Sequence, residues 1–170
     1  MPGWSRSVDL DHPAPLYREP VLEDVTDRDI VRALATDGRM SYTDLARATG
    51  LSVSAVHQRV RRLEQRGVLA GYAARVDATA VGLPLTAFVS ITAIDPAAVD
   101  DAPAKLTGIG AIEACHSVAG GESYILKVRV QGPGQLESLL AEIRLAADVS
   151  TRTTVVLSTP WEDRPPPLQP

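Results

Sequence analysis

The stretch "LSVSAVHQRVRRLEQRGVLAGY", residues 51–72, places four arginines on about four helical turns of a chain whose formal net charge is −4. Its apolar residues recur at helical spacing and form one narrow seam: Val53, Val56, Val60 and Leu63. This pattern predicts an amphipathic helix over 53–66, with Ser52 as its N-cap and Gly67 just after its end.

The side of this helix opposite the seam is polar, basic and free of acids. Projection at about 100° per residue places Ser54, Gln58, Arg61, Arg62 and Gln65 there, with Ala55 at the flank. Small residues and amides allow close approach to base edges, and arginines hold phosphates or bind guanine. Charge alone fits either a DNA-reading helix or a solvated surface.

Two further helices are expected upstream. Thr26 is a candidate N-cap before an apolar stripe formed by Ile30, Val31 and Leu34. Ser41 with Asp44 three residues later has the spacing of a capping box. The inner face of that second helix is expected to hold Leu45, Ala46 and Ala48.

The short turn "TGLS" between the second and third helices is typical of a helix-turn-helix, which projects its second helix from the surface. This context favours the DNA-reading interpretation of 53–66 over the solvated one. Tyr42, Arg47 and Arg75 could add contacts to the DNA backbone. The strand-like piece "VLAGYAARV", residues 68–76, would then form a wing.

Residues 85–158 change to a different period. Strand patterns at 85–94, 111–118, 123–130 and 150–158 alternate with helical patterns at 97–108 and 134–146. This β-α-β-β-α-β order predicts a sheet covered by helices on one face. The other face would show Phe88, Ile94, Ile125 and Val156, which is too apolar to stay wet, so we expect dimerisation through the sheet.

Charge divides the chain. Residues 22–75 hold nine arginines against seven acids, a net of +2, whereas residues 76–170 hold six basic residues against eleven acids, a net of −5. This asymmetry suggests a basic module for a polyanion joined to an acidic module with another task. No apolar run approaches the roughly 20 residues of a membrane helix, and no secretory signal is expected at the N-terminus. We therefore expect a cytoplasmic protein.

No metal site or catalytic constellation is expected. Cys115 is the single cysteine, for which we predict a small buried hydrophobe, and His12, His57 and His116 lack ligand spacing. No phosphate-cradling glycine loop or nucleophile motif is present. We expect neither an enzyme nor a bound cofactor.

The stretch "CHSVAGGESYIL", residues 115–126, is the second candidate site. Gly120 and Gly121 allow positive φ or close approach of a ligand to backbone N–H groups. An ordinary hairpin turn is the favoured alternative, since Gly-Gly is a common hairpin connection. His116 is similarly either a ligand contact or, by preference, an ordinary sheet residue.

The order of these parts resembles the Lrp/AsnC (feast/famine) family of prokaryotic transcription regulators over residues 22–158. The matching motifs are D-x-x-I-x-x-x-L, D-G-R-x-S, L-A-x-x-x-G-L-S and R-V-x-x-L-E-x-x-G-x-I/L-x-G-Y, followed more loosely by "VAGGESYILKVRV". The resemblance implies an α+β fold: an N-terminal winged helix-turn-helix and a C-terminal ferredoxin-like domain that dimerises and senses a small effector, usually an amino acid.

The resemblance also implies a domain plan. We expect an N-terminal extension at 1–21, a DNA-binding domain at 22–75, a linker at 76–84, an effector-binding and oligomerisation domain at 85–158, and a proline-rich tail at 159–170. The partners would be double-stranded DNA and further copies of the chain, assembled as dimers and then as octamers or another higher oligomer. The expected DNA-binding residues are Ser52, Ser54, Ala55, Gln58, Arg61, Arg62, Tyr42 and Arg47.

The implied effector loop departs from the family pattern. Its residues would be Gly120, Gly121, Glu122, Ser123 and Tyr124, joined by Thr153 and Thr154 from another chain. The usual form is close to V-T-G-x-x-D-Y, whereas this chain has "VAGGESY", with Ala119 and Ser123 replacing threonine and aspartate. A serine cannot offset an ammonium group. Either Glu122 takes over the charge, or the effector is not a simple α-amino acid, or the site is vestigial.

Two other functions stay open at this point. Haem-pathway decarboxylases resemble the same two-domain layout, but they need positioned His and Arg in a tetrapyrrole pocket, and only His116 stands in the sensor core. The other is a stand-alone sensing module with an idle helix-turn-helix. The leading hypothesis is a DNA-binding regulator controlled by a small effector.

Overall fold

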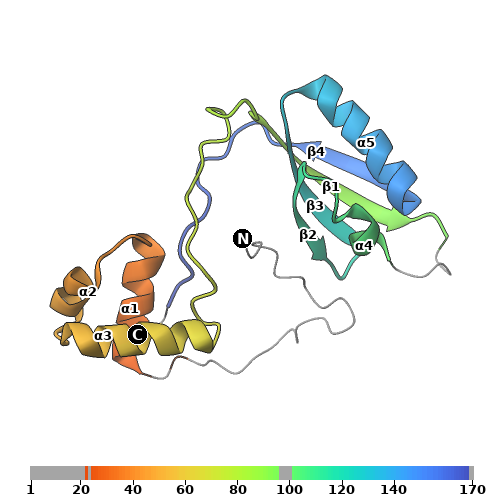
Figure 1. The fold of residues 1–170 in the computed structure, drawn as a ribbon. Coiled ribbons are helices and arrows are strands. Elements are labelled where there is room, and N and C mark those ends of the chain that lie inside the picture. Colours follow the sequence, from red (N-terminus) through yellow and green to blue (C-terminus); the bar gives the residue numbers. More distant parts are fainter. Residues whose placement is uncertain (1–21, 23, 96–100, 169–170) are drawn as a thin grey trace. The chain divides into compact units, whose positions relative to one another are not determined.

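The computed structural model describes residue 22 and residues 24–95 and 101–168. The chain divides into two compact units (Figure 1). Each unit has its own hydrophobic core. One unit contains the residues up to Arg75 together with the segment from Trp161, and the other contains Val76–Pro160. The break after Arg75 therefore lies where the net charge of the sequence changes sign.

Three helices form the first unit: α1 (Val25–Thr36), α2 (Tyr42–Thr49) and α3 (Val53–Gln65). The predicted caps of α2 and α3 are confirmed. The Ser41 hydroxyl accepts the N–H of Asp44 at 3.1 Å, and the Ser52 hydroxyl accepts the N–H of Ala55 at 3.2 Å. Gly50 ends α2 with a φ of 70°, a left-handed conformation that glycine adopts without a Cβ clash.

The three helices bury one apolar cluster: Ile30, Val31, Leu34, Leu45, Ala46, Val56, Val60 and Leu63. The three members from α3 are fully buried. Full burial of a valine or leucine side chain contributes about 1.5–3 kcal/mol. The seam therefore holds the back of α3 against its neighbours and leaves its opposite face outward.

Some details predicted for this unit were wrong. The N-cap of α1 is Asp24, whose Oδ1 accepts the N–H of Thr26 at 2.7 Å, because a carboxylate suits the positive end of a helix. Val53 is 46% exposed, since it projects about 50° from the mean direction of the other seam residues. Ala48 is also exposed, because it projects about 110° from the Leu45–Ala46 direction.

Residues 68–76 form no strand in the single chain, where no neighbouring strand satisfies their backbone groups. The backbone instead turns back on α3, with the N–H groups of Val68 and Leu69 donating to the carbonyl of Leu63 at 2.9 and 3.2 Å. The Tyr72 hydroxyl donates to Glu64 at 3.0 Å. The predicted wing is therefore an irregular extension rather than a paired strand.

The second unit contains β1 (Leu85–Ala93), α4 (Ala102–Leu106), β2 (Ile112–Ser117), β3 (Tyr124–Val130), α5 (Pro133–Ala147) and β4 (Val149–Val155). All paired strands are antiparallel, in the order β2-β3-β1-β4. This is the β-α-β-β-α-β arrangement predicted from the alternating patterns, and it brings the two central strands, β1 and β3, side by side.

Alternation along the strands separates the two faces of the sheet. Ala87, Val89 and Ile91 of β1 are buried in one core with residues of both helices. The opposite face, which we call the open face, carries Phe88 at 41% exposure. The same face is partly charged, because Arg129 Nε donates to Glu113 at 2.5 Å.

Two predictions for this unit need correction. The expected helix 97–108 is described as the shorter α4, while residues 97–100 lie outside the described part of the chain. Cys115 is exposed rather than buried, because β2 is an edge strand. No helix in the described ranges is both long and apolar enough to cross a membrane.

Candidate functional site

The polar face of α3 is the first candidate site. Gln58, Arg61, Arg62 and Gln65 line an open depression on this helix, and all four are exposed. Ser54 is exposed one turn earlier, where its hydroxyl lies 3.1 Å from that of the capping Ser52. Ala55 is half-buried at the flank. The structure thus brings the side chains predicted for the DNA-reading face onto one surface.

The arginines around this face differ in whether a nearby carboxylate pairs with them. Arg47 of α2 pairs with Asp44 at 2.7 Å, on the same exposed surface of that helix. Arg61 and Arg62 make no ion pair with the residues that the structure describes. These two guanidinium groups therefore present uncompensated positive charge to any polyanion that approaches α3.

Helix α2 packs against α3 through an aromatic contact. The rings of Tyr42 and His57 meet edge to face, with centroids 5.4 Å apart. Tyr42 is 38% exposed, so its hydroxyl end remains accessible. The contact orients the predicted backbone-contacting tyrosine against the helix that carries the basic face.

A third arginine of α3 has a role that the sequence did not reveal. Arg59 Nη1 lies 2.7 Å from Asp24 Oδ2 and 2.6 Å from Asp27 Oδ1. The hydrogen bond from Arg59, together with the backbone N–H of Thr26, lowers the pKa of Asp24 to about 2. No local pattern links these residues, because 35 positions separate Arg59 from Asp24.

The second candidate site is the loop between β2 and β3. The Val118 N–H donates to the Ser123 carbonyl at 3.2 Å, and the Ser123 N–H donates to the Ile91 carbonyl at 2.9 Å. Neither Gly120 nor Gly121 has a left-handed φ. The glycines therefore serve no strained turn in the single chain, and a Cβ on Gly121 would meet nothing within 4 Å.

The charge in this loop is already engaged. The Glu122 carboxylate forms an ion pair with Arg152 of β4, which was not among the predicted site residues. Glu122 is 23% exposed and Arg152 is 77% exposed. A ligand ammonium that approached Glu122 would therefore compete with the solvent-exposed guanidinium of Arg152.

The two predicted threonines lie farther along β4. Thr153 faces Val89 across the strand pair, on the half-buried side, while Thr154 faces Phe88 on the open face. Thr154 is exposed. Their prediction as contacts from another chain concerns an assembly and stays a prediction.

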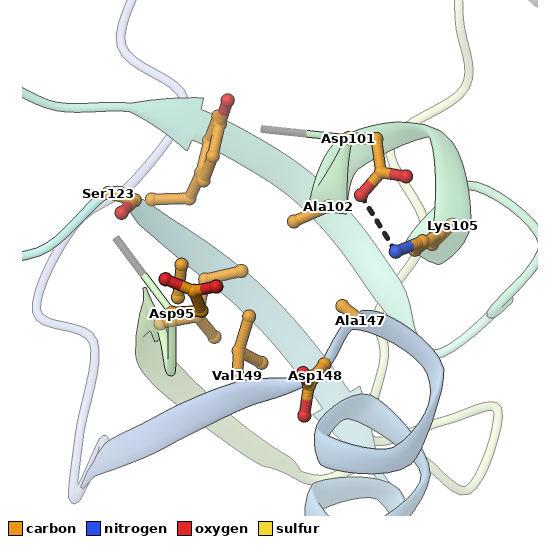
Figure 2. Close-up of a pocket in the computed structure, with 11 residues that line it drawn as sticks. Asp95, Asp101, Ala102, Lys105, Ser123, Ala147, Asp148 and Val149 are labelled. Carbon is orange, nitrogen blue, oxygen red and sulfur yellow. Dashed lines mark ion pairs between the residues drawn. The ribbon is translucent and has the colours of Figure 1, made fainter. Parts of the chain in front are cut away.

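A small cavity lies behind the loop, next to Ser123 and Tyr124 (Figure 2). Its volume is about 80 Å³, and Figure 2 shows the Asp101–Lys105 ion pair, 2.8 Å long, on the wall opposite Ser123. Asp95 and Asp148 also line it, and the lining includes neither Thr153 nor Thr154.

Comparison with known proteins identifies both units. Residues 24–64 match the AsnC-type helix-turn-helix domain, and residues 86–166 match the Lrp/AsnC ligand binding domain. The chain belongs to the Lrp/AsnC family. The predicted family and fold class are thereby confirmed, including the ferredoxin-like sheet unit.

The matches to individual Lrp/AsnC relatives extend over most of the length of each relative. The transcriptional regulator LrpA of Mycobacterium tuberculosis is 55% identical over 143 residues, which cover 84% of this chain and 95% of the relative. The leucine-responsive regulatory protein of Escherichia coli is 36% identical over 138 residues, covering 79% and 84%. A solved feast or famine regulatory protein from M. tuberculosis, complexed with L-methionine, gives a TM-score of 0.82 at 55% identity, covering 84% and 97%.

Membership of the Lrp/AsnC family answers the broad question of function. The relatives are helix-turn-helix transcriptional regulators, so this chain is a DNA-binding regulator with a ligand-binding domain. The same evidence places it in a family of transcription regulators.

Proposed function

We propose that α3 lies in the major groove of DNA and reads base sequence there through Ser54 and Gln58, while Arg61 and Arg62 hold phosphates or guanine. The uncompensated charge of Arg61 and Arg62 on an otherwise acid-free face is the observation that carries this proposal. Ser52, Ala55, Tyr42 and Arg47 flank the same surface and complete the interface.

Dimerisation brings two such helices to successive major grooves. The open face of the sheet, with exposed Phe88, is the surface through which two copies would pair. A two-fold dimer binds half-sites about 34 Å apart, so a roughly palindromic site is expected. Further assembly to octamers and action in the cytoplasm, where the DNA lies, belong to the same proposal.

The effector is an amino acid or a related metabolite, bound at Gly120–Tyr124 with Thr153 and Thr154 from a partner chain. The M. tuberculosis relative solved with L-methionine supports this ligand class. In this chain the Glu122–Arg152 pair offers both charges of a zwitterion: Glu122 would accept the ammonium, and Arg152 would bind the carboxylate. Differential affinity for two assembly states would couple effector level to DNA occupancy.

The DNA-binding proposal is tested by replacing both Arg61 and Arg62 with alanine. Each lost phosphate contact lowers the slope of log K against log salt by about 0.9, so we expect the slope to fall by about 2 per subunit. Gel-shift or fluorescence titrations with a duplex selected from a random library by the wild-type protein measure it.

The matched control is Arg144→Ala, which removes one exposed charge from α5 in the other unit. We expect that variant to keep the wild-type slope. An unchanged slope in the double variant would reject α3 as the DNA-contacting helix, and failure of the wild type to retard any fragment would favour the sensing-module alternative.

The effector proposal is tested by thermal shift with the twenty amino acids. A ligand at 100 times its Kd stabilises the folded state by about 2.7 kcal/mol. We expect at least one amino acid to raise the melting temperature of the wild type, and Glu122→Gln to lose that rise. Glu137→Gln, an exposed carboxylate on α5, is the matched control. A ligand response that survives Glu122→Gln would contradict the assignment of this loop.

A further inference from the structure

Arg59 is the arginine of α3 that does not share the outward face. At about 100° per residue it projects about 120° from the centre of that face and about 70° from the apolar seam. Its side chain is 24% exposed, whereas Arg61 and Arg62 are open to solvent. Arg59 therefore occupies the flank of α3 that faces α1.

The guanidinium of Arg59 ties two helices together. Its Nη1 binds the N-cap of α1, Asp24, and the first-turn residue Asp27, at 2.7 and 2.6 Å. Asp24 uses its other oxygen, Oδ1, to cap α1. Asp27 is 8% exposed, so its charge is withdrawn from water and depends on this partner. The middle of α3 is thereby joined to the start of α1 by directional bonds.

Directional bonds matter here because the seam beneath α3 is narrow. Its fully buried members are two valines and a leucine, and apolar burial is non-directional. A roll of α3 by about 20° would displace side-chain tips about 6 Å from the axis by about 2 Å. Hydrogen bonds to base edges do not tolerate a displacement of that size.

We propose that Arg59 is a positioning residue whose bridge to Asp24 and Asp27 sets the roll of α3 against α1, and thereby selects which side chains meet the bases. This inference rests on the proposed DNA-reading role of α3. Two carboxylates outweigh the single guanidinium, so the bridge carries net negative charge and repels a phosphate rather than holding one.

The test uses full-length protein and two duplexes of equal length, one selected by the wild type from a random library and one of random sequence. Arg59→Met keeps an unbranched, flexible stem that can pack at this flank, and it removes the guanidinium with its charge and hydrogen bonds. We expect the affinity ratio, selected over random, to fall about tenfold or more, the scale of one lost base contact. The salt slope on the random duplex should stay unchanged, because no phosphate contact is lost.

Asp27→Asn weakens the same bridge by removing the charge of one of its two carboxylates. Removing a negative charge would by itself strengthen binding to both duplexes, yet we expect the affinity ratio to fall as in Arg59→Met. Asp29→Asn is the matched control on α1, since Asp29 pairs at the surface with Arg32 at 2.6 Å. That variant should keep the wild-type ratio.

Two outcomes of the titrations would overturn the proposal. A variant that is merely destabilised loses active protein and weakens binding to both duplexes alike, leaving the ratio unchanged. A salt slope that falls by about 0.9 per subunit in Arg59→Met would make Arg59 a phosphate contact.

A crystal structure of Arg59→Met without DNA separates this inference from the function on which it rests. We expect α3 to be rolled against α1 relative to the wild type, and an unchanged roll would reject the positioning role. If the wild type prefers no duplex, the DNA-reading proposal fails while the roll still tests the bridge.

Discussion

At the scale of single residues, Asp24 does two things at once. One oxygen caps α1 and the other binds Arg59 of α3. Both contacts favour the ionised carboxylate, which is why its pKa falls to about 2. Asp24, rather than the predicted Thr26, is the N-cap of α1, and it therefore connects α1 to α3, the proposed DNA-reading helix.

This low pKa predicts how the helical unit responds to acid. The stabilisation from ionised Asp24 is fully present above the ordinary aspartate pKa of about 4 and is lost as the pH falls through about 2. Melting temperatures measured from pH 5 to pH 2 should fall less in Asp24→Asn than in the wild type. Equal losses would mean that the bridge to Arg59 does not form in solution, and Asp29→Asn should lose stability like the wild type.

At the scale of elements, the start of α3 depends on its N-cap, Ser52. The Ser52 hydroxyl satisfies the N–H of Ala55 and lies beside Ser54, so one serine both starts the helix and borders the face that we propose reads DNA. A helix that begins without such a cap leaves backbone N–H groups unpaired at its positive end. The start of α3 thus has a structural role beside the proposed functional one.

Removing this cap should cost stability. We expect Ser52→Ala to destabilise the helical unit by about 1 kcal/mol, the usual cost of a lost serine cap. Thermal unfolding followed by circular dichroism measures the change. Ser138→Ala on α5 is the matched control, because Ser138 is exposed and lies inside a helix rather than at its N-cap. Equal melting temperatures for the two variants would contradict the capping role.

At the scale of the whole molecule, the segment after the sheet unit returns to the helical unit. Leu168 packs against the core of α1, α2 and α3, and its carbonyl accepts from Arg32 Nη2 at 3.4 Å. Arg75, which ends the first part of that unit, pairs with Asp163 at 3.5 Å. The proline-rich end of the chain therefore belongs structurally with the DNA-binding helices.

This packing predicts unequal effects of one substitution at two leucines. Leu168→Ser should lower the stability of the helical unit by about 1 kcal/mol through lost apolar burial. Leu157→Ser makes the same change at a side chain that is 97% exposed and should have no measurable effect. Differential scanning calorimetry of the full chain compares them, and indistinguishable curves would argue against docking of this segment.

The open face of the sheet gives a second prediction at this scale. Phe88 lies in the central strand β1, opposite Lys127 and Thr154. A glutamate there would replace apolar surface of the proposed dimer interface with a charge that loses its water when two copies pair, so we expect Phe88→Glu to shift the protein toward monomer in analytical ultracentrifugation. Glu137→Gln on α5 should keep the wild-type state. A Phe88→Glu variant that stays fully dimeric would place the interface elsewhere.

The amino-acid sequence by itself determined the order and type of the helices and of the four sheet strands, but not the fate of the predicted wing. Apolar periodicity, the serine caps at Ser41 and Ser52 and the glycine after α2 act over a few residues, so each predicts its own helix locally. The alternating strands predicted the antiparallel sheet for the same reason. The outward face of α3 also followed, because it lies opposite its own apolar seam.

Only the tertiary structure decided which charges meet. The bridge from Arg59 to Asp24 and Asp27 joins different helices, and the Glu122–Arg152 pair joins a loop to a strand. The exposure of Cys115 similarly depends on the edge position of β2, and the docking of Leu168 depends on a chain segment that returns from the other unit. Periodicity reports what a residue does along its own element, whereas ion pairs and edges arise between elements that are distant in sequence.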